Sequence, residues 1–292
     1  MATSTGGRPL VIAHRGSSYA VAEHTLGAYL RAIDEGADGL ECDVRLTRDG
    51  HLVCVHDRRI DRTSSGRGVV SDFDLDDLRA LDFGSWRTDL PQHADAFIEE
   101  RDSTEAPVLT LERLLEVLVA APRPVRLLVE TKHPTRYAGL VEQRLVLLLR
   151  RFGLADPPDR AASPVTVMSF SPAALRRIRL LAPALPTVQL FLRMPVLRRN
   201  GSLAADIAGP GIHIVRAHPE YVVRAHARGH PVYVWTVDEP EDVELVVRLG
   251  VQAVITNRPD EVLALLRGLA PPRRSGRPRR AGRRRGGGSP RG

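Results

Sequence analysis

Segments with the pattern of a buried β-strand alternate with segments patterned as amphipathic helices along most of this chain. The first pair is the apolar run PLVIA at 9–13 and the helix-patterned TLGAYLRAIDE at 25–35, which ends at a glycine. Strict alternation predicts a parallel sheet covered by helices. About eight such units in roughly 260 residues favour a (β/α)8 TIM barrel over an open doubly wound sheet. The first strand is not followed by GxGxxG, which counts against a dinucleotide-binding fold.

The expected elements follow from the apolar spacing and from the turn residues between them. An Asp-Gly turn at 49–50 makes the second strand the first arm of a hairpin. The stretch 193–209 is poorly patterned, and we expect only a short helix there. The expected strands are 9–13, 39–46, 51–56, 125–129, 165–169, 187–192, 211–215, 231–236 and 251–255. The expected helices are 25–35, 111–120, 139–152, 172–181, 220–228, 239–249 and 260–269.

One long stretch interrupts the alternation. Residues 57–107 separate the hairpin from the next helix and contain RTSSGRG at 62–68 and an amphipathic segment at 74–81. A connection of this length is usually functional, so we expect a small inserted subdomain after the second strand. The expected organisation is a flexible N-terminus (1–8), a barrel (9–270) that includes the inserted subdomain (57–107), and a disordered tail (271–292).

The basic character of the chain lies in that tail. The net charge is +7, but the tail holds nine arginines and no acidic residue, so the rest of the chain is close to neutral. Arg, Gly, Pro and Ser bury too little apolar surface to offset the entropy of ordering. We favour a solvated terminus, with weak contact to anionic membranes or RNA as the alternative. The rest of the chain has no basic stripe or RNA-binding motif, so we expect no dedicated nucleic-acid partner.

The compartment is expected to be the cytoplasm. The N-terminal apolar run stops after four residues, which is too short for a signal peptide. All charge-free apolar runs are far shorter than the roughly 18 residues of a membrane span. The two cysteines, Cys42 and Cys54, lie on the arms of the hairpin and fit free thiols in a reducing interior better than a disulfide.

Acidic residues concentrate where the predicted strands end, which is where TIM barrels carry their chemistry. Residues two apart on a strand share a face, so Glu41 and Asp43 point together into the barrel mouth, and Glu130 and Lys132 form a second such pair. A single Glu-x-Asp in a strand is more often a solvated pair, but two same-face pairs of charged residues at successive strand ends favour a metal site. Three converging carboxylates repel one another unless a cation intervenes. Ligation by oxygen alone favours Mg²⁺ or Ca²⁺ over zinc.

Two histidines and two basic residues accompany the acids. His14 ends the first strand and His56 closes the hairpin. The near-neutral pKa of imidazole suits one of them to accept a proton and the other to donate one, and the sequence does not determine which. Arg15 and Lys132 supply the positive charge that a bound phosphate requires.

These residues belong to a set of motifs that occur in a fixed order. The set resembles the glycerophosphodiester phosphodiesterase family over about residues 9–266. The motifs are HRG at 14–16, EHT at 23–25, GADGLECDVRLTRDGHLVCVHD at 36–57, RTSSGRG at 62–68, ETK at 130–132, SF at 169–170, WTVD at 235–238 and ITNRPD at 255–260.

The resemblance implies a barrel that hydrolyses small-molecule glycerophosphodiesters to glycerol 3-phosphate and an alcohol with a divalent cation. It implies that His14 and His56 are the acid–base pair and that Arg15 binds the phosphate. Where the family usually has Asn between Glu and Thr, this chain has His24, so the positioning role of that residue is open. The implied metal ligands are Glu41, Asp43 and Glu130, and Lys132 lines the same site. Phe170 and Trp235 would form apolar walls for the substrate, although ordinary core packing is an equal alternative for both. Glu23 would brace the site or contact the waters of the metal.

Two rival functions remain at this point. A lysophospholipase D-like or sphingolipid phospholipase would use the same residues on lipid phosphodiesters at membranes. An aromatic content of 4% and the lack of an apolar loop in 57–107 count mildly against it. A non-catalytic barrel that only binds its ligand is the second rival, and the intact set of acids and histidines counts against it.

Overall fold

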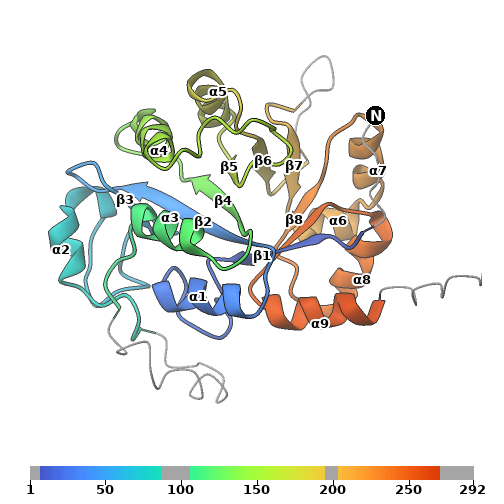
Figure 1. Cartoon of the computed structure of the whole chain (residues 1–292), viewed down its shortest axis with the longest axis horizontal. Coiled ribbons are helices and arrows are strands. Elements are labelled where there is room, and N and C mark those ends of the chain that lie inside the picture. The colour runs from blue at the N-terminus through green and yellow to red at the C-terminus, as the bar shows by residue number, and fades with distance from the viewer. Residues whose placement is uncertain (1–6, 87–105, 195–202, 270–292) are drawn as a thin grey trace, which may run out of the picture.

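The computed structural model describes residues 7–86, 106–194 and 203–269 (Figure 1). Three expected regions lie wholly or partly outside these ranges: residues 1–6 of the flexible N-terminus, residues 87–105 of the inserted subdomain and the whole tail at 271–292. Part of the poorly patterned stretch 193–209 also lies outside them.

The described residues form a nearly closed barrel, which confirms the predicted fold class. The nine-stranded sheet has the order β7-β6-β5-β4-β2-β1-β9-β8, and β3 (Leu52–Cys54) pairs antiparallel with β2 beside this path. All neighbours along the path are parallel, and single bridges from Ala208 to Val232 and from Gly211 to Trp235 link the two ends. The barrel strands are β1 (Leu10–His14), β2 (Gly39–Leu46), β4 (Arg126–Thr131), β5 (Val165–Ser169), β6 (Thr187–Phe191), β7 (Ile207–Pro210), β8 (Tyr233–Trp235) and β9 (Ala253–Thr256).

Helices surround the strands, as Figure 1 shows. Several begin at a side-chain cap: Thr25 accepts a hydrogen bond from the Ala28 amide, and Ser171 accepts one from the Ala174 amide. These caps satisfy amides that have no partner inside the helix. The helices are α1 (Leu26–Asp34), α3 (Leu111–Ala120), α4 (Leu140–Arg151), α5 (Pro172–Leu181), α6 (Ile212–Ala217), α7 (Glu220–Ala227), α8 (Pro240–Leu249) and α9 (Pro259–Leu269).

One predicted strand is wrong. The sequence favoured a strand at 211–215, but Ile212–Ala217 form helix α6, and the barrel strand is Ile207–Pro210 just before it. The apolar residues Ile214 and Val215 are buried against neighbouring helices, and so short an apolar run fits either element. The true strand contains Gly209, which reads as a turn in the sequence. A Cβ on Gly209 would lie 2.8 Å from side-chain atoms of Leu190 and Val188, so the strand passes too close to β6 for a side chain.

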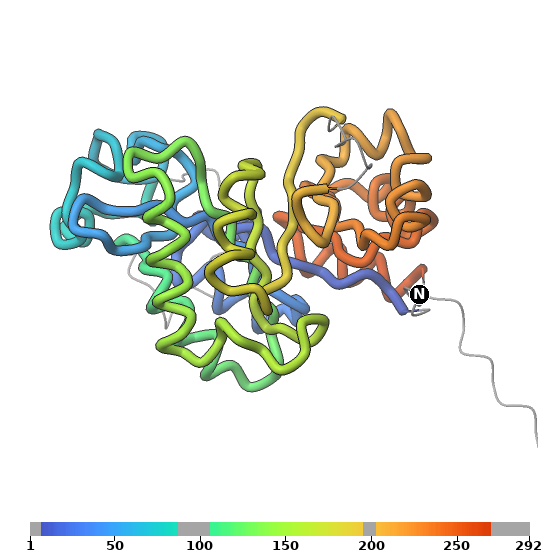
Figure 2. Tube along the Cα trace, turned by 90° about the horizontal axis from the view of Figure 1, so that it is seen from above, coloured from blue at the N-terminus to red at the C-terminus, as the bar shows by residue number. Residues whose placement is uncertain are grey.

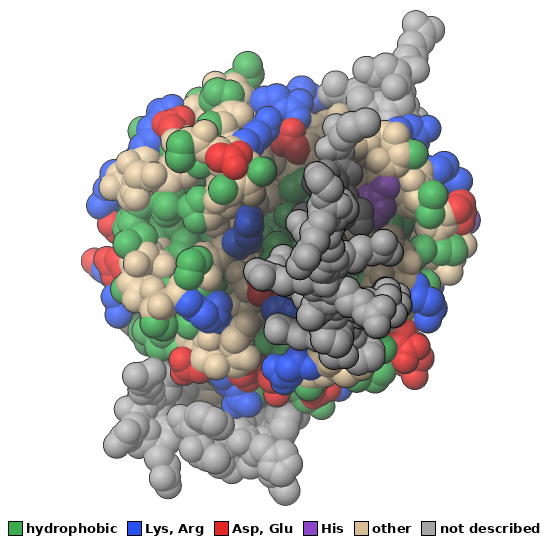
Figure 3. All heavy atoms as spheres, turned by 45° about the vertical axis from the view of Figure 1, so that its right-hand side comes forward, with side chains coloured by type: hydrophobic (Ala, Val, Ile, Leu, Met, Phe, Trp, Pro, Cys, Tyr) green, Lys and Arg blue, Asp and Glu red, His purple; other side chains and the backbone are tan. Residues whose placement is uncertain are grey.

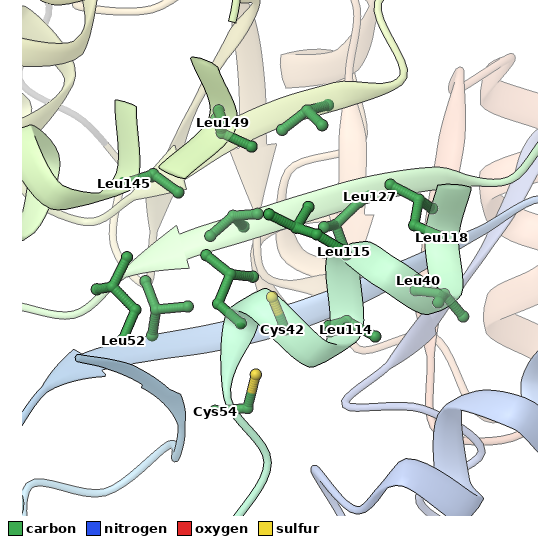
Figure 4. Close-up of a cluster of buried hydrophobic side chains, with 14 of the residues drawn as sticks. Leu40, Cys42, Leu52, Cys54, Leu114, Leu115, Leu118, Leu127, Leu145 and Leu149 are labelled. Atoms are coloured by element: carbon green, nitrogen blue, oxygen red, sulfur yellow. The ribbon is translucent and has the colours of Figure 1, made fainter. Parts of the chain in front are cut away.

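Strand alternation places the core and the polar residues on opposite sides of β2. Leu40 and Cys42 face outward and pack among leucines of α3 and α4, and Cys54 of β3 joins the same cluster (Figure 4). Both cysteines are free and buried, as expected. Glu41 and Asp43, which alternate with them, must therefore face the barrel interior.

The described part of the expected insertion lies at one end of the molecule, far from α8 and α9 in both Figure 1 and Figure 2. It contains a 3₁₀ turn at Val70–Asp72 and helix α2 (Leu75–Arg79). Its apolar residues, with those of β3, form a separate buried cluster of Val53, Val55, Ile60, Val70, Leu75, Leu78, Phe83 and Val108. This part of the chain thus rests on a core of its own beside the barrel.

Acidic and basic side chains are mixed on the surface. Figure 3 shows one face, on which Lys and Arg side chains lie beside Asp and Glu side chains. Ion pairs between exposed side chains, such as Arg113 with Glu116 at 2.7 Å, also occur on the surface of the described residues. None of the helices in the described ranges is long and apolar enough to cross a membrane.

Candidate active site

Three carboxylates from two adjacent strands converge inside the barrel. In the sheet, His14 at the end of β1 lies beside Glu41 of β2, and Asp43 lies beside Glu130 of β4. Glu41, Asp43 and Glu130 are all buried, and each offers an oxygen within 4.8 Å of the others. The sequence-predicted acidic cluster is therefore present as a compact group.

Basic side chains offset only part of this charge. The Lys132 ammonium lies 2.8 Å from Asp43 Oδ1 and 2.9 Å from Glu130 Oε2, and Arg15 Nε lies 3.1 Å from Asp43 Oδ2. Burial acts to raise the pKa of Asp43, but Lys132 and other neighbours hold it well below its usual range. Burial and the charge of Asp43 raise the pKa of Glu130 to about 8 and raise that of Glu41 well above its ordinary value.

This electrostatic imbalance fits a divalent cation. Among the described residues, the Glu41 carboxylate forms no ion pair and accepts a hydrogen bond only from the Arg15 amide, at 3.1 Å. Three buried carboxylates lie against two cationic side chains, Lys132 and Arg15, and burial together with the charge of Asp43 raises the pKa of Glu41 and of Glu130. Clustered carboxylate oxygens are the ligands that Mg²⁺ and Ca²⁺ prefer. The donor set therefore fits the expected ion.

His14 contacts the side-chain amide of Asn257, and a second hydrogen bond fixes the orientation of that amide. Its Nδ1 lies 2.7 Å from Asn257 Oδ1, and the Asn257 Nδ2 donates to Asp238 Oδ2 at 2.6 Å. A carboxylate can only accept, so Asn257 must turn its amide nitrogen to Asp238 and its oxygen to His14. His14 Nδ1 consequently carries a proton, and Nε2 is left as an acceptor. Burial and the Arg15 charge lower the pKa of His14 to about 3, so the ring is neutral near pH 7.

His56 has a charged partner instead. Its Nδ1 lies 2.7 Å from Asp57 Oδ1, and Arg62 donates to the other oxygen of Asp57 at 2.7 Å. Burial lowers the pKa of His56, while Asp43 and Asp57 act in the opposite direction. Arg45 donates two hydrogen bonds, of 3.0 and 2.7 Å, to the His56 carbonyl and so holds this end of the loop.

Arg15 is fixed by a network that includes Glu23. Its guanidinium donates to Glu23 Oε1 at 3.0 Å, and Arg62 donates to both oxygens of Glu23 at 2.7 and 2.9 Å. Burial alone would raise the pKa of Glu23, but these arginines lower it to about 2. Glu23 thus braces Arg15 rather than joining the carboxylate cluster directly.

His24, the departure from the usual Glu-Asn-Thr motif, contacts the cluster directly. Its buried ring places Nε2 2.9 Å from Asp43 Oδ2 and Nδ1 2.7 Å from the Tyr29 hydroxyl. The Tyr29 hydroxyl also donates to the Glu41 carbonyl at 3.1 Å. His24 therefore contacts both Asp43 of the cluster and the tyrosine that binds the Glu41 backbone. Sequence reasoning missed this contact because the backbone of His24 has a φ of 62°, which sets the direction of the side chain and leaves no mark in the spacing.

Two aromatic residues lie together at the ends of β5 and β8. The Phe170 and Trp235 rings meet edge to face with centroids 5.4 Å apart, and the Trp235 indole donates to the Gly209 carbonyl at 2.9 Å. Phe170 is 38% exposed, so the pair forms a partly open apolar surface rather than a sealed core contact. By contrast, His133, the third histidine near this end of the barrel, pairs with buried Glu142 at 2.6 Å and takes no part in the cluster.

Comparison with known proteins identifies the family. Residues 14–261 match the pattern of the glycerophosphoryl diester phosphodiesterase family. The chain belongs to this family. It is 47% identical over 262 residues, 89% of this chain and 93% of the relative, to a Mycobacterium tuberculosis protein named "Probable glycerophosphodiester phosphodiesterase 1". It is 32% identical to the glycerophosphodiester phosphodiesterase of Caldanaerobacter subterraneus, with 89% and 98% of the two chains covered.

Solved structures agree with the barrel. An Oleispira antarctica phosphodiesterase in complex with the product sn-glycerol-3-phosphate superposes with a TM-score of 0.75 at 24% identity, covering 90% of this chain and 99% of the other. As a member of the glycerophosphoryl diester phosphodiesterase family, this chain is a phosphodiester hydrolase, and the resemblance seen in its motifs is confirmed.

The glycine of the family's HRG motif is required by packing as well as by conformation. Gly16 has a φ of 84°, and a Cβ there would lie 2.6 Å from the Ala28 carbonyl carbon. Gly229 has a similar φ of 77° with nothing within 4 Å. We expect Gly229→Ala to cost about 1–2 kcal/mol of unfolding free energy from its left-handed backbone. Gly16→Ala should cost about 1–3 kcal/mol more, because α1 must move. Chemical denaturation measures both, and equal losses would contradict the packing argument.

Proposed function

We propose that this chain hydrolyses glycerophosphodiesters to glycerol 3-phosphate and an alcohol, using a divalent cation and two histidines. The observation that carries the proposal is the buried cluster of Glu41, Asp43 and Glu130, in which three carboxylates lie within 4.8 Å of one another beside two cationic side chains, Lys132 and Arg15. The Oleispira antarctica phosphodiesterase of the same fold holds sn-glycerol-3-phosphate as its product, which supports this substrate class.

The three carboxylates would hold Mg²⁺ or Ca²⁺. When bound, such an ion offsets the charge on the phosphoryl oxygens and can lower the pKa of a hydroxyl or water. Arg15 and Lys132 already border the cluster, and each can turn part of its hydrogen-bonding capacity toward a phosphate that arrives there. Together they offset the further negative charge that gathers on the phosphoryl oxygens in the transition state.

The two histidines differ in ways that favour separate roles. His14 is neutral, has a neutral partner and presents an unprotonated Nε2, so it suits the base that takes the proton of the nucleophile. The Asp57 carboxylate beside His56 favours a protonated ring more than the neutral Asn257 amide beside His14 does. Burial lowers the pKa of both histidines, so this difference in partners is what makes His56 the better candidate for the acid that protonates the leaving alkoxide. Both roles hold whether the nucleophile is water or the 2-hydroxyl of the substrate's own glycerol, which would give a cyclic phosphate first.

Phe170 and Trp235 would form the apolar wall against which the carbon skeleton of the glycerol packs. Their edge-to-face contact and partial exposure support this role over pure core packing.

The expected cytoplasmic location is supported by two buried free cysteines. For the tail at 271–292 a solvated terminus stays the favoured interpretation, and the alternative of weak contact with anionic membranes or RNA rests on its arginine content alone.

Product analysis tests the function directly. Purified protein is incubated with glycerophosphodiesters and, separately, with lysophospholipids and sphingolipids, and the phosphate esters are identified by ³¹P NMR. We expect glycerol 3-phosphate and free alcohol from the glycerophosphodiesters. Turnover of the lipid substrates alone would favour the membrane phospholipase, and binding without turnover would favour the non-catalytic barrel; either result would overturn the proposal.

A further inference from the structure

A pocket lined by basic side chains lies beside the carboxylate cluster. It is bounded by the end of β2, the loop after β4 and residues 69–71 of the expected insertion. Ser71 and Tyr137 form part of its wall, and no Asp or Glu occurs among the described residues that line it. Its basic lining residues are Arg45, Arg58, Lys132 and Arg136.

The pocket shares a wall with the proposed site. Lys132 lines it and also contacts Asp43 and Glu130. Arg45 follows Asp43 by two residues on β2, so it lies on the same strand face. Because the Arg45 guanidinium also holds the His56 carbonyl, the pocket lies on the His56 side of the cluster.

The positive charge of the pocket is only partly compensated. Arg136 pairs with Asp72 at 2.8 Å. Arg45 forms no ion pair with any described residue, and the Arg58 side chain forms neither an ion pair nor a hydrogen bond within the same part of the chain. Like charges held near one another without counter-ions attract an anion from solution.

We propose that this pocket binds a second anionic group, a carboxylate or a phosphate, carried by the alcohol that leaves. The preferred substrates are then glycerophosphodiesters whose leaving alcohol is itself negatively charged. This inference rests on the proposed function, in which His56 protonates the leaving alkoxide and the alcohol therefore departs on this side. A cationic headgroup would be repelled by the same residues.

Four diesters that differ only in the leaving alcohol test the inference. They are glycerophosphoglycerol, the same diester with a terminal phosphate, glycerophosphoglycerate and glycerophosphocholine. We expect the KM of the two anionic diesters to be about 3- to 10-fold below that of glycerophosphoglycerol, the size that one or two exposed charge pairs contribute. The KM of glycerophosphocholine should be the highest. These differences should shrink at about 1 M salt, where exposed charges are screened.

Variants connect the preference to the pocket. Arg58→Gln is expected to remove at least about half of the preference, measured as the ratio of kcat/KM for anionic over neutral diester. Arg59→Gln is the matched control, because Arg59 is the neighbouring exposed arginine, pairs with Asp61 at 3.1 Å and does not line the pocket. It should leave the ratio unchanged.

The outcomes separate the subsite from the function on which it rests. A preference for the phosphate diester alone or for the carboxylate diester alone supports the subsite and says which anion it takes. Equal KM values for neutral and anionic diesters overturn it while leaving the proposed function intact. A preference that survives in the double variant Arg58→Gln/Arg136→Gln also overturns it. If none of the four diesters is hydrolysed, the proposed function and the subsite both fail.

Discussion

Chelation with EDTA is expected to abolish hydrolysis of glycerophosphodiesters, and added Mg²⁺ or Ca²⁺ should restore it. The reason is that a cation held by Glu41, Asp43 and Glu130 would supply positive charge to the phosphodiester, whereas Lys132 and Arg15 are already paired with carboxylates of the site. Charge stabilisation by an ion contributes several kcal/mol to a transition state. We therefore expect kcat/KM to fall by at least about 10³-fold. Activity before chelation, after chelation and after readdition of each ion measures the effect.

Variants show whether the ion acts through the cluster. Asp43→Asn keeps the size of the side chain and removes one ligand charge, so it should lower both activity and the affinity for the ion. Asp57→Asn is a useful comparison, because Asp57 contacts His56 and is not part of the three-carboxylate group. It should lower activity without lowering affinity for the ion. Full activity in EDTA would show that the carboxylates have some other role.

His14→Ala and His56→Ala are each expected to lower kcat by about 10²–10⁴-fold on a glycerophosphodiester with an alkyl leaving alcohol, the usual size of acid–base catalysis. The two losses should separate when the leaving alcohol is replaced by p-nitrophenol. This group departs without being protonated, so the loss in His56→Ala should shrink by at least about tenfold, while the loss in His14→Ala should persist. Stopped-flow or steady-state assays of both variants on both substrates give the four rates.

The reverse pattern, with His14→Ala rescued by the better leaving group, would exchange the roles of the two histidines. Turnover close to that of the wild type in either variant would remove that histidine from the mechanism. His133→Ala is the control for loss of an imidazole elsewhere in the fold, since His133 contacts Glu142 and Arg177 binds the same carboxylate. It should affect stability more than turnover.

Much of the fold was predictable because it follows from local patterns. The alternation of strands and helices predicted the barrel. Side chains also alternate in direction along β2, which correctly predicted that Glu41 and Asp43 share a face and which leaves Cys42 in the opposite, helix-facing layer. The strand at Ile207–Pro210 was not predictable in the same way. Its identity depends on the close passage of β6 beside Gly209, a tertiary contact that local spacing does not encode.

The candidate site was likewise predictable only where local patterns determine it. Residues at strand ends were found because their position in the strand fixes their direction. The residues that orient them were not assigned roles, although WTVD and ITNRPD were noted as motifs. Asn257 reaches His14 through the pairing of β1 with β9, and Asp238, which follows β8, contacts Asn257 through the pairing of β8 with β9. Likewise, the contact of His24 with Asp43 depends on a left-handed backbone conformation. Register and backbone conformation are properties of the folded chain.

The central claim is that Glu41, Asp43 and Glu130 share one divalent cation. Anomalous diffraction from crystals equilibrated with Mn²⁺ or Ca²⁺ tests this claim most directly, because it locates the ion independently of activity. The account predicts a single strong peak bonded to oxygens of all three carboxylates, at about 2.0–2.6 Å. Crystals at saturating metal concentration that show these carboxylates turned away from one another, with no peak between them, would contradict it.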